Sequence, residues 1–138
     1  MSAAPPVLHD VAPAAWRDMN GHMNIAYYTV LITRFLDLLT ESTGFGAAYR
    51  EASGAALFVV EMRTVYRREL RVGERVQVTG AFTAAAARRL DVVCTIHAEG
   101  ALAAEAGIAF VNVDLTTRRS RAFAPQALER ARSAIAVA

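Results

Sequence analysis

The residues whose types and spacing suggest chemistry are concentrated in one stretch, Asp18-Met19-Asn20-Gly21-His22-Met23-Asn24, which holds a carboxylate, an imidazole and two amides. It precedes residues 24–43, which contain neither glycine nor proline and which we expect to form a helix capped by Asn24. The first amides of a helix lack intrahelical acceptors and lie at the positive end of its dipole, so they can hold an oxygen that acquires negative charge. Ile25 would present the first such N–H, and Asp18 would face it as base or nucleophile.

Each of these residues also has a plain structural interpretation. Asp18 and Asn20 are typical turn residues, whose side chains bond the nearby backbone. His22 is equally compatible with a packed histidine that bonds backbone groups. Gly21 indicates a positive φ or a close approach, and Tyr28 lies at a helical spacing that is typical of a core residue.

Metal and nucleophile motifs are missing from the sequence. His9 and His97 have no cysteine or carboxylate beside them at ligand spacing, so we expect no metal site. There is no glycine-rich phosphate loop and no Gly-x-Ser-x-Gly elbow. The one cysteine, Cys94, lies in a strand-like run, where a free thiol usually behaves as a small buried hydrophobe. This argues for a reducing compartment and against a thiol nucleophile.

Length and composition predict one domain over residues 1–138, with 54% hydrophobic residues to build its core. No apolar run approaches the ~18 residues of a membrane helix, and the N-terminus lacks a signal-like pattern, so we expect a cytoplasmic protein without a membrane partner. All 15 basic residues are arginines, whose guanidinium groups bind phosphate in a bidentate manner. They are scattered among acidic residues, which argues against nucleic-acid binding.

The elements that must position the stretch are a long helix and an antiparallel sheet. Apolar residues recur around most of the axis of 24–43, which is typical of a buried helix at the centre of a domain. A loop is expected up to about residue 54. Turn signals at 72–74 and 99–101 separate strands. The expected strands are 7–11, 57–70, 74–84, 88–98 and 102–115, and a short amphipathic helix is expected over 125–136.

A meander of strands can bury such a helix only by wrapping around it, so the fold class is α+β. The outer face of the sheet would then carry more apolar residues than a solvated face should. They are Leu57, Val59, Val65, Val93 and Val111. We therefore expect a partner subunit against that face, in a homodimer or homotetramer.

The sequence resembles the hotdog-fold acyl-CoA thioesterases of the 4-hydroxybenzoyl-CoA thioesterase type over nearly its whole length. The motifs that carry the resemblance are Asp18-x-x-Gly21-His22-Met23-Asn24 with Tyr28, Tyr66-Arg67-Arg68-Glu69-Leu70 running to Gly73, and Val113-Asp114. The resemblance implies a hotdog fold, a long central helix wrapped by an antiparallel sheet of about five strands. It also implies hydrolysis of an acyl-CoA, with Asp18 as general base or nucleophile and the Ile25 amide as oxyanion donor.

The chain departs from this family at the helix. Many members carry acidic residues soon after the tyrosine, whereas Ile32, Thr33 and Arg34 stand there, so a second carboxylate has to come from elsewhere. The resemblance implies no cofactor apart from the CoA of the substrate. The CoA phosphates need cations, and the densest clusters are Arg67-Arg68 and Arg88-Arg89.

A narrower similarity, to thioesterases of carnitine breakdown, rests on Trp16-x-Asp18-x-Asn20-Gly21-His22-Met23 and on Val60-Glu61. It implies a short acyl group with a quaternary ammonium, as in betainyl-CoA. Strand alternation places Phe58, Val60, Met62, Thr64 and Tyr66 on one face, and Glu61 on the other, toward the partner. Glu61 either faces the cation, with Tyr28, Tyr66 or Trp16 as aromatic neighbours, or pairs with an arginine.

Two other uses of the fold remain as alternatives. Hotdog enoyl-CoA hydratases place a histidine five residues after the aspartate, usually with a proline between, whereas His22 comes four residues after Asp18. A non-catalytic acyl-CoA binding or sensor module would keep the fold and the arginines without needing Asp18. The presence of Asp18 favours the hydrolase.

Overall fold

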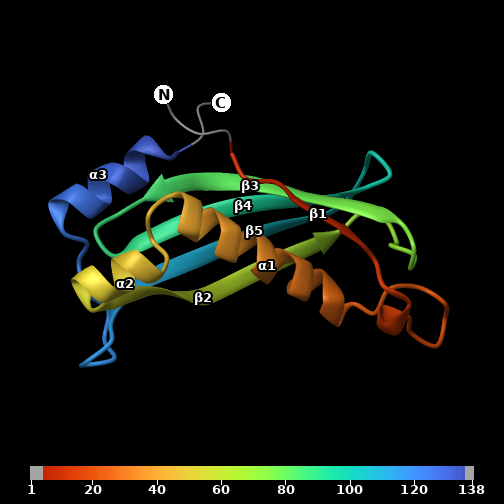
Figure 1. Cartoon of the computed structure of the whole chain (residues 1–138), viewed down its shortest axis with the longest axis horizontal. Coiled ribbons are helices and arrows are strands. Elements are labelled where there is room, and N and C mark those ends of the chain that lie inside the picture. Colours follow the sequence, from red (N-terminus) through yellow and green to blue (C-terminus); the bar gives the residue numbers. More distant parts are fainter. Residues whose placement is uncertain (1–4, 136–138) are drawn as a thin grey trace.

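The computed structural model describes residues 5–135 and shows a five-stranded antiparallel sheet curved around a long helix (Figure 1). The elements are β1 (Leu8–Val11), a 3-10 turn (Ala14–Trp16), α1 (Ala26–Ser42), α2 (Ala47–Ser53), β2 (Ala55–Tyr66), β3 (Arg75–Ala85), β4 (Arg89–Ala98), β5 (Ala101–Asp114) and α3 (Pro125–Ser133). The strand order across the sheet is β1-β3-β4-β5-β2. The predicted α+β class, with a wrapped helix, is confirmed.

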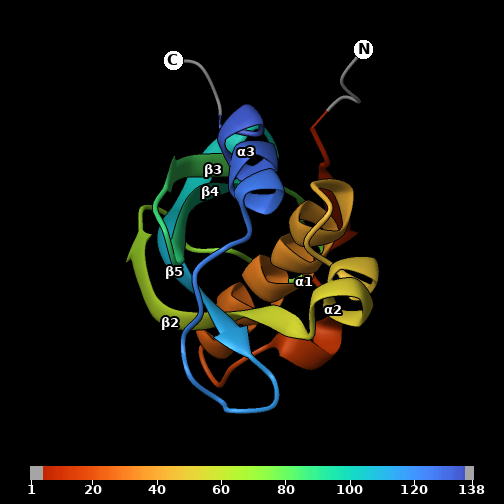
Figure 2. The same ribbon diagram turned by 90° about the vertical axis from the view of Figure 1, so that its left-hand side faces the viewer.

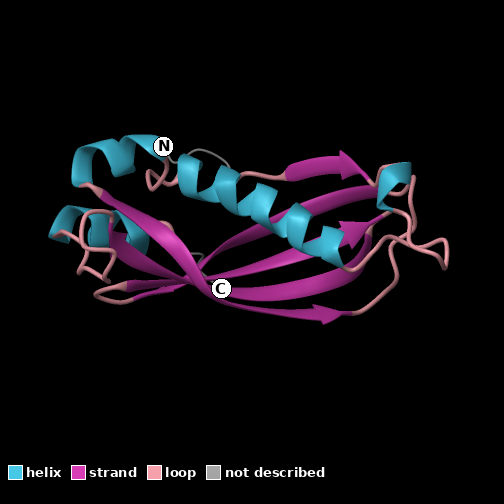
Figure 3. Cartoon of the chain, turned by 90° about the horizontal axis from the view of Figure 1, so that it is seen from below, coloured by secondary structure: helices cyan, strands magenta, loops and turns pink. Residues whose placement is uncertain are grey.

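Helix α1 lies in the concave face of the sheet, and the sheet curls around it when viewed from the end (Figure 2). Its buried side chains are Tyr28, Leu31, Ile32, Phe35, Leu36 and Leu39. The opposite side of the helix is open, since Leu38 is exposed. The helix therefore lies at the centre of the domain, as predicted, with one side left open. No helix among residues 5–135 covers the convex face of the sheet (Figures 2 and 3).

The strands β3, β4 and β5 form the expected meander, but β2 does not join it next to β3. The turn at Glu99 and Gly100, both with positive φ, closes the β4–β5 hairpin as predicted. The turn signal at 72–74 closes no hairpin, because β2 pairs with β5 at the far edge of the sheet. The connection 67–74 instead crosses the end of the sheet, where Leu70 is completely buried.

Strand β2 contains a bulge at Val60, since its register with β5 shifts between Val59 and Glu61. A bulge adds one residue to the strand, so the residues before the bulge point to the opposite face from the one that simple alternation would give them. Leu57 and Val59 therefore face the inner side, not the outer face that alternation predicted, and Phe58 shares the outer face with Glu61.

The segment predicted as a loop before residue 54 contains α2, a correction that its short length explains. Seven residues are too few for a helical period to show, and the helix is held by its buried Tyr49. Helix α3 begins at Pro125 as predicted and ends at Ser133, short of its predicted last residue, Ala136, which lies outside the described residues. Arg130 of α3 lies over the rings of Phe45 and Tyr49, so α2 and α3 lie together at one end of the sheet (Figure 3).

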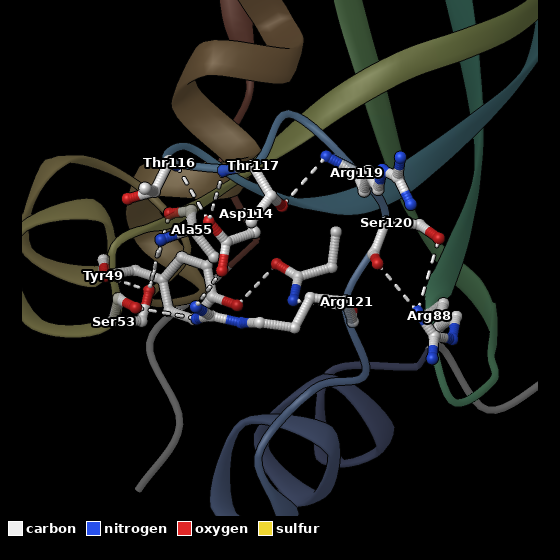
Figure 4. A network of polar contacts seen from close by, with 11 residues as sticks. Tyr49, Ser53, Ala55, Arg88, Asp114, Thr116, Thr117, Arg119, Ser120 and Arg121 are labelled. Carbon is white, nitrogen blue, oxygen red and sulfur yellow. Dashed lines mark hydrogen bonds and ion pairs between the residues drawn. The ribbon is translucent and has the colours of Figure 1, made fainter.

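That same end contains a connected set of polar contacts (Figure 4). The Tyr49 hydroxyl donates to Asn112 Oδ1 at 2.6 Å, and Asn112 Nδ2 donates to the carbonyl of Arg121 at 3.0 Å. The Arg121 guanidinium in turn donates to Asp114 Oδ2 at 3.1 Å and to the carbonyl of Ser53 at 2.7 Å. These contacts tie the chain after β5 to α2. In the part of the chain that the structure describes, no helix is long and apolar enough to cross a membrane.

Candidate active site

The turn 17–23 folds back on itself with Asp18 at its centre. The Asp18 N–H donates to the His22 carbonyl at 2.7 Å, and the Gly21 N–H donates to the Asp18 carbonyl at 3.1 Å. Asp18 Oδ1 accepts the backbone N–H groups of Asn20 at 2.9 Å and of His22 at 3.1 Å. The Asx interpretation of Asp18 is thus correct, and these bonds also fix the direction of its carboxylate.

Gly21 is required for its backbone conformation rather than for space. Its φ is +82°, and a Cβ built at this position would meet nothing within 4 Å. The left-handed conformation costs glycine no steric strain. It allows the turn to bring the His22 amide back to Asp18.

The beginning of α1 presents one free amide. Asn24 Oδ1 accepts the Ala26 N–H at 2.9 Å, and the Asn24 carbonyl accepts the Tyr27 N–H at 3.0 Å. The Ile25 N–H has no hydrogen-bond acceptor among residues 5–135. Because it lies at the positive end of the helix dipole, this amide can hold an oxygen that gains negative charge.

Asp18 and Ile25 line the same open pocket, whose volume is about 410 Å³. The pocket lies between the turn and the end of β2. Its other lining residues are Asn20, His22, Met23, Tyr28, Tyr66, Arg67, Arg68 and Glu69. The structure therefore brings together most of the site residues predicted from the sequence.

Tyr28 and the segment 69–71 form the wall of this pocket. The Met23 N–H donates to the Leu70 carbonyl at 2.8 Å, and the Leu70 N–H donates to the Tyr28 hydroxyl at 3.0 Å. Burial raises the pKa of Tyr28, so its hydroxyl stays neutral. Its ring meets Tyr66 edge to face at 4.9 Å between centroids. Tyr28 is thus built into the wall, while Tyr66 is 43% exposed.

One charged lining residue, Glu69, was not singled out in the sequence. Its Oε2 lies 3.2 Å from Nε2 of His22, so the imidazole is neither packed in the core nor bonded to backbone. Glu69 stood within the quoted family motif. Nothing in the sequence indicated that it would meet His22, because this contact depends on how 67–74 crosses the end of the sheet.

The arginines Arg67 and Arg68 lie at the rim of the pocket, and each is paired with a carboxylate. Arg67 Nη2 lies 2.8 Å from Glu105 Oε2, and Arg68 Nη2 lies 2.8 Å from Glu74 Oε2. The Arg67–Glu105 pair is exposed, and such pairs are weak and screened by solvent, whereas the Glu74 side chain is only 14% exposed. A phosphate group can therefore compete with Glu105 for the Arg67 guanidinium.

Arg88, Arg89 and Glu61 are not brought to this pocket. Arg88 donates to the Ser120 carbonyl at 2.8 Å, in the region that Figure 4 shows. Arg89 bonds Asp91 at 2.8 Å and lies 3.6 Å from Glu61 on the outer face of the sheet. Within this chain, Glu61 is therefore paired with an arginine, as one of its two interpretations proposed.

Trp16 lies behind the turn rather than in the pocket. Its ring is buried, stacks on Tyr27 at 4.7 Å and has the Arg34 guanidinium 5.4 Å from its centroid. Arg34 also pairs with Asp10 at 3.0 Å. Trp16 therefore supports the turn and leaves Tyr66 as the aromatic side chain open to the pocket.

Two further groups bear on the chemistry. Residues 5–135 contain no cluster of His, Cys, Asp and Glu arranged to hold a metal ion. Cys94 is buried, and burial raises the pKa of its thiol to about 12. At neutral pH this thiol stays protonated and is a poor nucleophile.

Comparison with known proteins agrees with this geometry. The family model described as the Thioesterase-like superfamily matches residues 12–131. A betainyl-CoA thioesterase of Pseudomonas aeruginosa is 29% identical over 85 residues, which cover 62% of this chain and 54% of that protein. The chain thus matches about half the length of this curated relative.

Solved structures with the same fold include a hypothetical Staphylococcus aureus protein in complex with CoA. Its TM-score is 0.85 at 26% identity, over 96% of this chain and 84% of that chain. A DHNA-CoA thioesterase from Staphylococcus aureus has a TM-score of 0.81 at 18% identity, over 92% of this chain and 88% of that one. The second likeness shows the fold alone. The predicted hotdog fold is confirmed.

Proposed function

Because the chain belongs to the Thioesterase-like superfamily, we propose that it hydrolyses a small acyl-CoA to the free acid and CoA. One observation carries this proposal: the Asp18 carboxylate and the free Ile25 amide line the same pocket. Thioester hydrolysis needs an acceptor for a proton, or a nucleophile, beside a donor for the carbonyl oxygen. The pocket holds both.

In the proposed reaction the thioester carbonyl oxygen lies at the Ile25 N–H, which stabilises the charge that the oxygen gains. Asp18 either takes a proton from the attacking water or attacks the carbonyl carbon itself, and water then hydrolyses the anhydride. In both routes a C–O bond forms, the C–S bond breaks, and a proton derived from water ends on the sulfur of CoA. The sum is thioester plus water to acid plus thiol.

We place the phosphate end of CoA at Arg67 and Arg68, because both lie on the rim of the pocket that holds Asp18. The CoA bound to the Staphylococcus aureus neighbour supports a CoA thioester as the substrate class. Arg88 and Arg89, the other candidate pair, line no part of this pocket.

For the acyl group we propose a short cation such as the betainyl group, supported by the Pseudomonas aeruginosa relative. Tyr66 offers an exposed aromatic ring, which attracts a quaternary ammonium. Glu61, on the outer face, could reach such a cation only in the pocket of a second subunit. A carboxylate near the cation contributes on the order of 1 to 4 kcal/mol, enough for about tenfold selectivity.

The experiment is a thiol-release screen across acyl-CoAs of differing length, aromaticity and charge. It includes betainyl-CoA and its uncharged isostere 3,3-dimethylbutanoyl-CoA. Because the Cys94 thiol is buried, the folded protein itself should not react with the thiol reagent. Turnover of any acyl-CoA supports the hydrolase. Binding without turnover across the whole panel would favour the sensor alternative.

The acyl proposal is tested separately, with Glu61→Gln in the same assay. Wild type should prefer betainyl-CoA over the isostere in kcat/KM by about tenfold or more, and the variant should lose that preference. If wild type has no preference, or if the variant keeps it, the betainyl assignment fails while the hydrolase assignment stands.

We propose that the protein works as a homodimer or homotetramer. Phe58 and Val60 of β2 and Val93 of β4 are large apolar residues left exposed in the single chain. Apolar residues that gather on one face of a sheet are typical of a subunit interface. Sedimentation velocity at micromolar concentration should therefore find little monomer. A purely monomeric species would contradict assembly and would remove any role of Glu61 in a partner's pocket.

A further inference from the structure

Glu69 supplies the second carboxylate of the pocket. The expected position for such a group, on α1 after Tyr28, is occupied by Ile32, Thr33 and Arg34. Among residues 5–135, Asp18 and Glu69 are the two carboxylate residues that line the pocket. They come from two segments, the turn 17–23 and the crossing segment 67–74, which meet where Glu69 contacts His22.

Contacts connect the two carboxylates through a single residue. Glu69 Oε2 lies 3.2 Å from His22 Nε2, and the His22 backbone N–H donates to Asp18 Oδ1 at 3.1 Å. The Asp18 N–H in turn donates a hydrogen bond to the His22 carbonyl at 2.7 Å. A shift of His22 therefore moves two of the bonds that orient Asp18.

Among residues 5–135, the one ion pair of the Glu69 carboxylate is with His22. Arg68 and Arg71 share a neighbouring surface hollow with Glu69, but Arg68 pairs with Glu74 at 2.8 Å instead. The Glu69 carboxylate faces the imidazole of His22 through Nε2, the ring nitrogen that lies 3.2 Å from it. Nδ1 remains outside this contact.

We propose that Glu69 is a positioning residue of the hydrolysis proposed above, on which this inference rests. It holds the His22 ring, and through the His22 amide it holds the Asp18 carboxylate. The Glu69 side chain is 71% exposed, and an ion pair so exposed adds little to folding stability. Misplacing a reacting group by as little as ~1 Å, in contrast, can cost a large factor in rate.

The test compares kcat, KM and Tm for Glu69→Ala, Glu69→Gln and the control Glu129→Ala, which removes an exposed carboxylate on α3. Glu69→Ala should lower kcat about tenfold with KM within about twofold and Tm unchanged. Glu69→Gln keeps a side-chain oxygen beside His22 Nε2 and should restore most of kcat. In a His22→Ala background, Glu69→Ala should have no further effect.

Two results would overturn the inference: kcat of Glu69→Ala within about twofold of wild type, or the same fold loss with and without His22. A readout independent of turnover is the ¹⁵N shift of the His22 ring, which should change in Glu69→Ala and not in Glu129→Ala. An unchanged ¹⁵N shift would show that Glu69 does not contact His22 in solution and would overturn the inference. The hydrolase assignment would stand. A wild type without turnover on any acyl-CoA would overturn the hydrolase assignment, and with it the catalytic role of Glu69.

Discussion

The two ends of the molecule both depend on polar groups but use them in opposite ways. At the end with α2, Asn112 is completely buried, and its side chain accepts a hydrogen bond from Tyr49 and donates one to the carbonyl of Arg121. At the end with the turn 17–23, the Ile25 amide is left without an acceptor within the described part of the chain, and its residue is 61% exposed. Buried polar groups stabilise a fold only when they are satisfied. Groups left open in a pocket are free to bind a substrate.

The largest effect on folding should come from the buried end. Asn112→Leu leaves the Tyr49 hydroxyl and the Arg121 carbonyl without their partners, and should lower the free energy of unfolding by about 3 kcal/mol. The activity per folded molecule should not change. Urea unfolding measures the loss, with Asn20→Ala at the exposed end as the matched control, expected within about 0.5 kcal/mol of wild type. Equal losses in the two variants would contradict the contrast between the ends.

The next largest effect should come from removing the Ile25 amide, and it should lower kcat without changing stability. Ile25 has a φ of −56°, which the proline ring also imposes, so Ile25→Pro should fold while losing the one free amide. We expect kcat to fall by about 100-fold, as it does when an oxyanion donor is removed. The control Ile25→Ala keeps the amide and should keep most of kcat. If the Pro and Ala variants are equally active, the amide does not hold the carbonyl oxygen.

A smaller effect should come from the arginines at the rim. Replacing Arg67 and Arg68 with alanine should raise KM for an acyl-CoA about five- to tenfold with little change in kcat, because we propose that their charges bind the nucleotide and not the reacting carbonyl. The same change at Arg88 and Arg89 should leave KM near the wild-type value. A truncated pantetheine thioester should not distinguish any of these variants. If it is affected as strongly as the acyl-CoA, the rim arginines do not bind the phosphates.

The features that the sequence predicted well are those set by residues close together in the chain. The helical spacing of 24–43 and the residues of the turn depend on near neighbours, and the structure places Asp18 and Ile25 beside one pocket as expected. The strands were also found, with ends within a few residues except at 67–70. The residue roles in the turn stay predictions until the variants are measured.

What the sequence missed depends on contacts between distant segments. Alternation along β2 could not reveal the bulge at Val60, which is a property of its pairing with β5. The turn signal at Gly73 predicted a hairpin between β2 and β3, because the sequence does not show that β2 pairs with β5 instead. Glu69 was missed for the same reason, since it meets His22 only when 67–74 crosses the sheet.

The central claim, that the Asp18 carboxylate does the chemistry while the opposite end supplies stability, is tested most directly by kcat and Tm of Asp18→Asn. Asparagine keeps an oxygen that can accept the Asn20 and His22 amides, so the turn should survive. We predict that kcat falls by about 100-fold or more, while KM and Tm stay close to wild type. A variant that keeps more than about a tenth of the wild-type kcat would contradict the account.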